Sequence, residues 1–241
     1  MNPAMLHVAL FDLGDTLMRA QNDWPPILER ADRALTETLA TAGLPLNADR
    51  FHQELTQTLQ RYYQERDRLQ IETTIFSVVR ELLLQTGQPM PPDAVIYQAL
   101  RARYTITQQN WQLEDDTLPS LQALRQKGLR LGIVSNAVDH QDVLDLAEQF
   151  GIAPLFDLIL TSAACGFRKP HPRIFERALA HWNISPGQAV MVGDRLDTDI
   201  AGAQNSGITA IWLTRRAKIP AVIAPAPDAR VATLAELVNI L

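Results

Sequence analysis

The residues of this chain that could do chemistry fall in four short segments. In chain order they are Asp12 with Gly14, Asp15 and Thr16; Ser135 with Asn136; Lys169; and Asp194 with Asp199. Attack on a phosphate ester needs an ionised nucleophile, donors for the phosphate oxygens, a positive charge and hard oxygen ligands for a divalent cation. These residue types predict phosphoryl transfer, with Asp12 as the nucleophile.

Three of the four segments follow short apolar runs. Asp12 ends the run 5–11, Ser135 follows 131–134, and Asp194 follows 189–193. Parallel sheets collect ligands at the carboxyl ends of their strands, so we expect these side chains to meet at one edge of a sheet. Taken singly, each segment also suits a plainer role, such as a helix N-cap at Ser135, a capping turn at Asp194 or a solvated surface lysine at Lys169.

Oxygen ligands with retained waters suit Mg²⁺. We expect Asp12, the backbone carbonyl of Gly14 and Asp194 to bind this ion, and Asp199 to hold a metal-bound water. Phosphate oxygens would then be held by the hydroxyl and backbone amides at Ser135 and Asn136. Lys169 would neutralise both the aspartate and the phosphate.

The composition narrows the protein class. The 241 residues carry a net charge of −5, so a broad positive field for nucleic acid is not expected. One cysteine, Cys165, excludes an internal disulfide and favours a reducing compartment, the cytoplasm. We find no apolar stretch approaching ~20 residues, and therefore expect no membrane span and no export signal.

The element pattern predicts an α/β protein with a doubly wound parallel sheet and an inserted helical domain. The core is expected at 1–17 and 117–241, with a helical cap at 18–116. Expected strands are 6–12, 130–134, 158–160, 189–192 and 209–213, separated by helices at 119–127, 141–150, 172–182 and 198–205. Expected cap helices are 25–42, 47–69, 73–85 and 93–111, a natural four-helix bundle.

Together these segments resemble the haloacid dehalogenase (HAD) superfamily. The residues that carry the resemblance are Phe-Asp-Leu-Gly-Asp-Thr-Leu (11–17), Val-Ser-Asn (134–136), Phe-Arg-Lys-Pro-His-Pro-Arg-Ile-Phe (167–175) and Val-Gly-Asp-Arg-Leu-Asp-Thr-Asp-Ile-Ala-Gly-Ala (192–203). The resemblance covers essentially the whole chain. It implies a Rossmann-like core with a four-helix cap and a Mg²⁺-dependent phosphatase of a small phosphorylated metabolite, working through an aspartyl-phosphate on Asp12.

One residue departs from that pattern. In phosphatases of this family the second residue after the nucleophile is usually an aspartate that serves as general acid and base. Here that residue is Gly14, and a carboxylate comes one position later, at Asp15. General acid–base help contributes about 10²–10⁴-fold to a rate. Gly14 therefore keeps a second hypothesis open, a catalytically weak protein that binds a phosphorylated ligand or a protein partner as a sensor or assembly factor.

Other chemistries known on related folds agree less well with the residues. Phosphonatases use a Schiff-base lysine from the cap, whereas no lysine lies between Met18 and Asp116. Haloacid dehalogenases of the same cap type lack the metal-binding Gly-Asp pair that is present here at Gly193 and Asp194. Receiver domains carry their acceptor aspartate on a middle strand and have no helical insert.

The insert is expected to supply substrate specificity. Five of its arginines are candidates for binding a second anionic group of the substrate, or for solvated helix faces paired with acidic neighbours. They are Arg61, Arg66, Arg68, Arg101 and Arg103.

Overall fold

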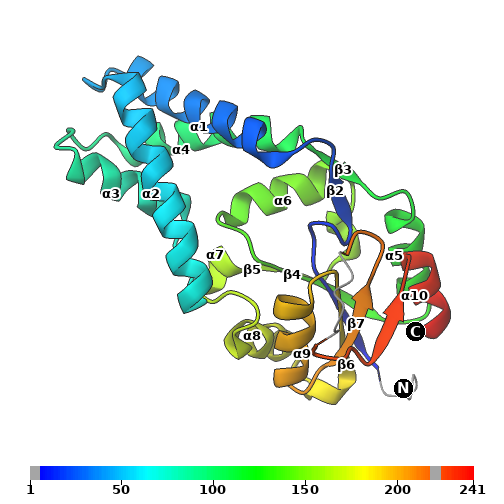
Figure 1. Ribbon diagram of the computed structural model, residues 1–241. Helices are drawn as coiled ribbons and strands as arrows, with labels where there is room; N and C mark the ends of the chain where they lie inside the picture. Colours follow the sequence, from blue (N-terminus) through cyan, green and yellow to red (C-terminus); the bar gives the residue numbers. More distant parts are fainter. Residues whose placement is uncertain (1–5, 218–223) are drawn as a thin grey trace. The chain divides into compact units, whose positions relative to one another are not determined.

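The computed structural model describes residues 6–217 and 224–241 (Figure 1), so Met5 and Lys218 lie outside the described residues. The chain divides into two compact units, one of residues 1–19 and 113–241 and the other of residues 20–112. The first unit contains a six-stranded parallel sheet in the order β5-β4-β1-β6-β7-β8. This arrangement confirms the predicted fold class, a parallel α/β core.

The six strands are short and mostly buried, as expected for strands covered on both faces. They are β1 (Val8–Phe11), β4 (Arg130–Ser135), β5 (Leu158–Thr161), β6 (Ala189–Gly193), β7 (Thr209–Leu213) and β8 (Ala229–Val231). The helices of this unit are α5 (Thr117–Gln126), α6 (His140–Gln149), α7 (Ser162–Cys165), α8 (Pro172–Trp182), α9 (Ala201–Asn205) and α10 (Leu234–Ile240), with a π-helical turn, η4, at Leu196–Ile200.

Successive side chains of a strand point to opposite faces of the sheet, so part of the hydrophobic core lies on each face. Val8 and Leu10 of β1 belong to a buried cluster that includes Ile174 and Phe175 of α8 and Ala203 of α9. The residues between them along the strands point to the other face. Because β1 lies between β4 and β6, its carboxyl end is central in the sheet, which is where the site described below is built.

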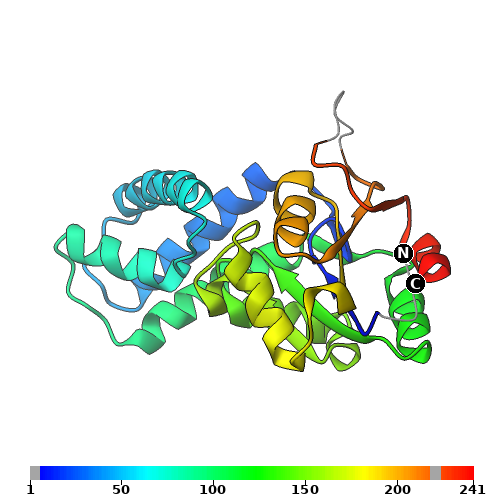
Figure 2. The ribbon, with the colours of Figure 1, turned by 90° about the horizontal axis from the view of Figure 1, so that it is seen from below.

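The second unit consists of four helices. They are α1 (Trp24–Thr41), α2 (Ala48–Leu69), α3 (Ile75–Gln85) and α4 (Asp93–Gln108). α1 runs beside α4 in both views (Figures 1 and 2). Side-chain caps begin two of the helices, because Asn47 accepts from the backbone of Arg50 and Thr74 accepts from the backbone of Ser77.

A buried ion pair joins α1 to α4 inside this unit. Nε of Arg103 donates to Oδ1 of Asp32 at 2.7 Å, and the Arg103 side chain is only 4 % exposed. Removing one partner of a buried pair leaves an uncompensated charge. We therefore expect Arg103→Met to lower the free energy of unfolding by about 3–5 kcal/mol. Chemical denaturation of the full chain measures this, with Arg101→Met on the exposed face of the same helix as control; equal stability of the two variants would contradict it.

The structure differs from the predicted elements at the two chain crossings and at the C-terminal end. Residues expected to be loop and helix form the paired strands β2 (Met18–Ala20) and β3 (Trp111–Leu113), and the units divide at 19/20 and 112/113. β8, α10 and the short α7 were not predicted from the sequence. Strands of three residues and a helix of one turn carry too little periodicity to stand out.

No helix among the described residues is long and apolar enough to cross a bilayer.

Candidate active site

The carboxyl edge of the sheet gathers the predicted site residues. Phe11 pairs with Ile133 of β4 and with Val192 of β6, so Asp12 leaves the sheet between these two neighbours. The backbone N–H of Asp12 donates to the carbonyl of Val192 at 2.9 Å, which holds the first residue of the turn against β6. Ser135 is the last residue of β4, and Asp194 directly follows β6. Parallel pairing thus brings three segments far apart in the sequence to one edge.

Lys169 lies within this cluster of acidic side chains. Its Nζ is 2.6 Å from Oδ1 of Asp12 and 2.7 Å from Oδ1 of Asp199, and the side chain is completely buried. Burial alone would lower the pKa of this ammonium group, but the charges of the two aspartates and the hydrogen bonds to them raise it. Lys169 is therefore a fixed positive charge against Asp12 and not a solvated surface lysine.

Three carboxylates lie close enough to share one cation. Ligand oxygens of Asp12, Asp194 and Asp199 all lie within 4.8 Å of one another. The pKa of Asp12 is raised to about 6, because burial raises it, Lys169 opposes the rise and Asp199 adds to it. Burial and then the neighbouring carboxylates raise the pKa of Asp194 to about 8.

One ammonium group does not balance three carboxylates. Burial is the largest cause of the raised pKa values of Asp12 and Asp194, and the neighbouring carboxylates add to it. A divalent cation bound to hard oxygen ligands would neutralise the remaining negative charge. The donor set therefore fits a Mg²⁺ ion.

Gly193 allows Asp199 to reach this cluster. A Cβ at Gly193 would lie 2.3 Å from Oδ2 of Asp199, closer than side-chain atoms approach one another. Asp199 itself is buried, and its Oδ2 accepts from the backbone N–H of Arg195 at 3.0 Å. The absence of a side chain at the end of β6 is thus a requirement of the site.

Asp15 lies in the turn after Asp12 and has its own backbone conformation and charged surroundings. Asp15 has φ of 58°, in the left-handed region that aspartate tolerates better than most residues. Its N–H donates to the carbonyl of Met18 at 2.6 Å. Burial raises the pKa of the half-buried Asp15 carboxyl, while the charge of Arg216 lowers it and that of Glu114 raises it. Asp15 thus interacts with Arg216 and Glu114, and its charge also raises the pKa of Asp194.

Three other predicted residues have distinct surroundings. Thr16 is fully buried, and its hydroxyl has no hydrogen-bond partner among residues 6–217 and 224–241. Ser135 is buried at the sheet edge. The side chain of Asn136 makes two hydrogen bonds to the backbone of Lys169. These two bonds occupy the side-chain amide of Asn136, whereas the phosphate contact predicted from the sequence involves its backbone amide.

Two supports of the site carry no sequence signal that we recognised. Nε1 of the buried Trp212, in β7, donates to the backbone carbonyl of Asp194 at 2.7 Å. Glu114, with its side chain 4 % exposed, accepts from Arg19 at 2.9 Å and from Arg216 at 2.6 Å and pairs with Arg215 at 3.1 Å. Both are contacts between residues about 20 to 100 positions apart, which local spacing does not reveal.

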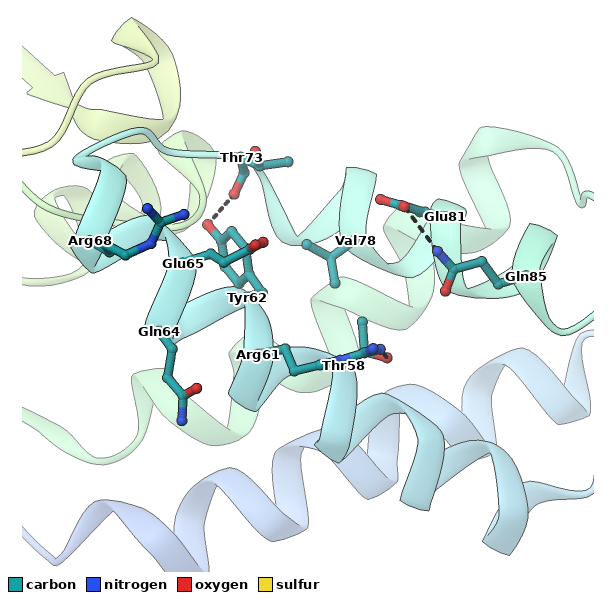
Figure 3. Close-up of a pocket in the computed structure, with 10 residues that line it drawn as sticks. All are labelled: Thr58, Arg61, Tyr62, Gln64, Glu65, Arg68, Thr73, Val78, Glu81 and Gln85. Atoms are coloured by element: carbon teal, nitrogen blue, oxygen red, sulfur yellow. Dashed lines mark hydrogen bonds between the residues drawn. The ribbon is translucent and has the colours of Figure 1, made fainter.

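In the helical unit, the candidate arginines have separate environments. Arg61 and Arg68 border a groove of about 670 Å³ between α2 and α3, where Figure 3 shows them with the acidic Glu65 and Glu81. The groove is lined by Thr58, Arg61, Tyr62, Gln64, Glu65, Arg68, Thr73, Val78, Glu81 and Gln85. Arg66 lies 4.3 Å above the ring of Tyr63, and Arg103 is buried against Asp32. Arg103 is therefore neither solvated nor available to an anion.

Known proteins share this architecture. Residues 6–207 match the haloacid dehalogenase-like hydrolase family. A glyceraldehyde 3-phosphate phosphatase of Methanothermobacter thermautotrophicus is 32% identical over 86% of this chain and 85% of its own length. A HAD phosphatase of Thermococcus onnurineus is 26% identical, with a TM-score of 0.67 over 98% of this chain and 97% of its own.

A second solved structure shares the fold with a different chemistry. The 2-haloacid dehalogenase of Pseudomonas syringae pv. Tomato DC3000 is 25% identical, with a TM-score of 0.68 over 98% of each chain. The fold alone thus accommodates both phosphatases and dehalogenases. The family match covers most of the chain, and the sheet edge carries the residues by which we recognised the resemblance. The chain belongs to the haloacid dehalogenase-like hydrolase family.

Proposed function

We propose that this hydrolase is a phosphatase that cleaves a small phosphate monoester through an aspartyl-phosphate on Asp12. The observation that carries the proposal is the contact of Lys169 with both Asp12 and Asp199, next to the carboxylate of Asp194. An ammonium group and a cation site beside a carboxylate nucleophile suit a phosphoryl group, which brings its own negative charge. The pair Gly193 and Asp194, which haloacid dehalogenases of the same cap type lack, favours the phosphatase over dehalogenation.

The residues divide the work as follows. One oxygen of Asp12 attacks phosphorus as the bond to the leaving oxygen breaks, and a water then attacks the phosphorylated Asp12 to release phosphate. Lys169 holds Asp12 in place and neutralises charge on the phosphoryl oxygens, and the hydroxyl of Ser135 donates to one of them. Asp12, Asp194 and the carbonyl of Gly14 would hold Mg²⁺, with Asp199 binding a water of that ion. When bound, the ion supplies charge neutralisation for the attacking and phosphoryl oxygens.

The substrate class follows from the relatives and from the charge of the chain. Two of the similar proteins are phosphatases, one of them named for glyceraldehyde 3-phosphate. The net charge of −5 argues against nucleic acid, and the single cysteine suits the cytoplasm. We therefore propose a small phosphorylated metabolite as the substrate, without a nucleic-acid partner.

The test is phosphate release from p-nitrophenyl phosphate and from a panel of sugar, nucleotide and organic-acid phosphates, with Mg²⁺ and with EDTA. We expect turnover that EDTA abolishes and that added Mg²⁺ restores. Turnover that is equal with and without the chelator would contradict the proposed metal site.

Gly14 supports the competing hypothesis, a binding protein with little turnover. In a folded protein that binds Mg²⁺, the absence of turnover on every panel member would favour that hypothesis. Turnover on the activated aryl ester alone would keep the phosphatase and point to the missing acid at position 14.

Gly193→Ala tests the packing of the cation site. The added methyl group would displace the Asp199 carboxylate, which lies 2.3 Å from its position. We expect kcat/KM for p-nitrophenyl phosphate to fall by about 100-fold, because small displacements of catalytic groups have effects of that size. Gly187→Ala, where the methyl meets no atom within 4 Å, is the matched control. If Gly193→Ala keeps activity within twofold of the wild type, Asp199 tolerates the displacement and the argument is wrong.

A further inference from the structure

The backbone of Lys169 is held by one side chain. Lys169 lies in the turn between α7 and α8, outside any strand or helix. Its N–H donates to Oδ1 of Asn136 at 2.8 Å, and Nδ2 of Asn136 donates back to the Lys169 carbonyl at 2.9 Å. Among the described residues, neither of these Lys169 backbone groups has a backbone partner. The two bonds also determine which way the Asn136 amide points. In the flipped orientation, Oδ1 would face the Lys169 carbonyl and Nδ2 would face the Lys169 N–H, and neither bond could form.

Asn136 is in turn anchored to the sheet. It directly follows Ser135, the last residue of β4, which pairs with Thr161 of β5. The next residue, Ala137, exchanges hydrogen bonds of 2.9 and 3.0 Å with the hydroxyl of Ser162. The loop after β4 thus holds both ends of the segment that runs from Ser162 to Lys169.

The position of the Lys169 ammonium depends on this attachment. A lysine side chain has four rotatable bonds and about 2 kcal/mol of rotamer entropy, so its own flexibility does not fix Nζ between two carboxylates. A displaced backbone would move Nζ away from Asp12 or Asp199, which it contacts at 2.6 and 2.7 Å. We propose that Asn136 is a positioning residue that acts through Lys169, holding its ammonium group against the nucleophile. The effect on turnover rests on the proposed phosphatase function, whereas the placement of the lysine does not.

A double-mutant cycle separates this role from a direct contact of the Asn136 side chain with phosphate. We expect Asn136→Ala to lower kcat/KM for p-nitrophenyl phosphate by about 10- to 100-fold, the size of a small misplacement of a catalytic group. In a Lys169→Met background the same change should alter kcat/KM by less than about twofold. Equal losses in both backgrounds would overturn the proposal, because the Asn136 side chain would then act without the lysine.

A second readout needs no turnover. The chain has three lysines, and exposed Lys127 is an internal reference for buried Lys169. We expect acetylation by an amine-reactive ester, followed by peptide mass spectrometry, to leave Lys169 protected in the wild type. Asn136→Ala should raise the ratio of Lys169 to Lys127 labelling by at least about tenfold. Unchanged protection of Lys169 in this variant would overturn the proposal.

Two further variants complete the design. Asn136→Asp is nearly isosteric and keeps the acceptor for the Lys169 N–H but not the donor to its carbonyl, so we expect an intermediate increase in labelling even if Asn136→Ala does not fold. Asn205→Ala, at an exposed position at the end of α9, should match the wild type in both readouts. If the wild type releases no phosphate, the phosphatase proposal fails, and the labelling ratio alone decides the role of Asn136.

Discussion

We expect the Asp12→Asn protein to fold and to release phosphate from p-nitrophenyl phosphate about 10⁴-fold more slowly than the wild type, or not at all. An amide is nearly isosteric with the carboxylate but is not a nucleophile at neutral pH. The fold should survive because Lys169 keeps its contact with Asp199 at 2.7 Å. Burial is the largest cause of the raised pKa of Asp194, and the charge of Asp12 comes next, so the loss of this carboxylate also relieves part of the like-charge repulsion.

The measurement is kcat/KM at saturating Mg²⁺, with circular dichroism and chemical denaturation as tests of folding. Asp115→Asn is the matched control, since it makes the same change at an exposed position of the same unit. We expect the control to match the wild type in both rate and stability. Full activity of Asp12→Asn would refute the aspartyl-phosphate mechanism.

The second large effect is expected at Gly14. Gly14→Asp restores a carboxylate at the position where related phosphatases carry their general acid. A general acid contributes about 10²–10⁴-fold when the leaving oxygen is a poor leaving group, and much less for an activated aryl ester. We therefore expect kcat on alkyl phosphates to rise by about 100-fold or more, while kcat on p-nitrophenyl phosphate changes by less than about tenfold. The ratio of the two rates is the readout, because a general loss of stability would lower both.

Asp15 provides the control for this experiment. It lies in the left-handed region at φ 58°, Arg216 and Glu114 act on its carboxyl, and its own charge acts on Asp194. From this placement we expect Asp15→Asn to leave the ratio of alkyl to aryl rates unchanged. If Asp15→Asn lowers the alkyl rate and Gly14→Asp brings no gain, Asp15 already serves as the acid and the prediction is wrong.

The strand-end residues could be placed from the sequence because parallel sheets simplify the problem. Each apolar run had to be a buried strand, and a strand that ends in a polar side chain presents it at a shared edge. The local sequence around Asp12, Ser135 and Asp194 was therefore enough to predict that these residues meet at one edge. The helices of the second unit were likewise predictable from their periodicity and breaks, with ends that differ by up to three residues.

The elements that the sequence did not reveal are short. β2, β3 and β8 have three residues each, and their pairing comes from residues far along the chain. The side chain of Arg103 could not be placed from the sequence either. Its position on α4 suits a solvated face, and it is buried only because α1 brings Asp32 against it. Partners that are distant in sequence leave no periodic trace.

The sequence by itself determined the parallel α/β core, the helical insertion, the family and the residue types of the site, since these depend on local periodicity and on chemistry carried within short segments. Only the tertiary structure decided how the site is held. It placed Lys169 between Asp12 and Asp199, Asn136 on the lysine backbone, and Trp212 on the carbonyl of Asp194. Each is a contact between residues far apart in the sequence, and its energy depends on three-dimensional distance and burial, which residue spacing along a chain does not encode.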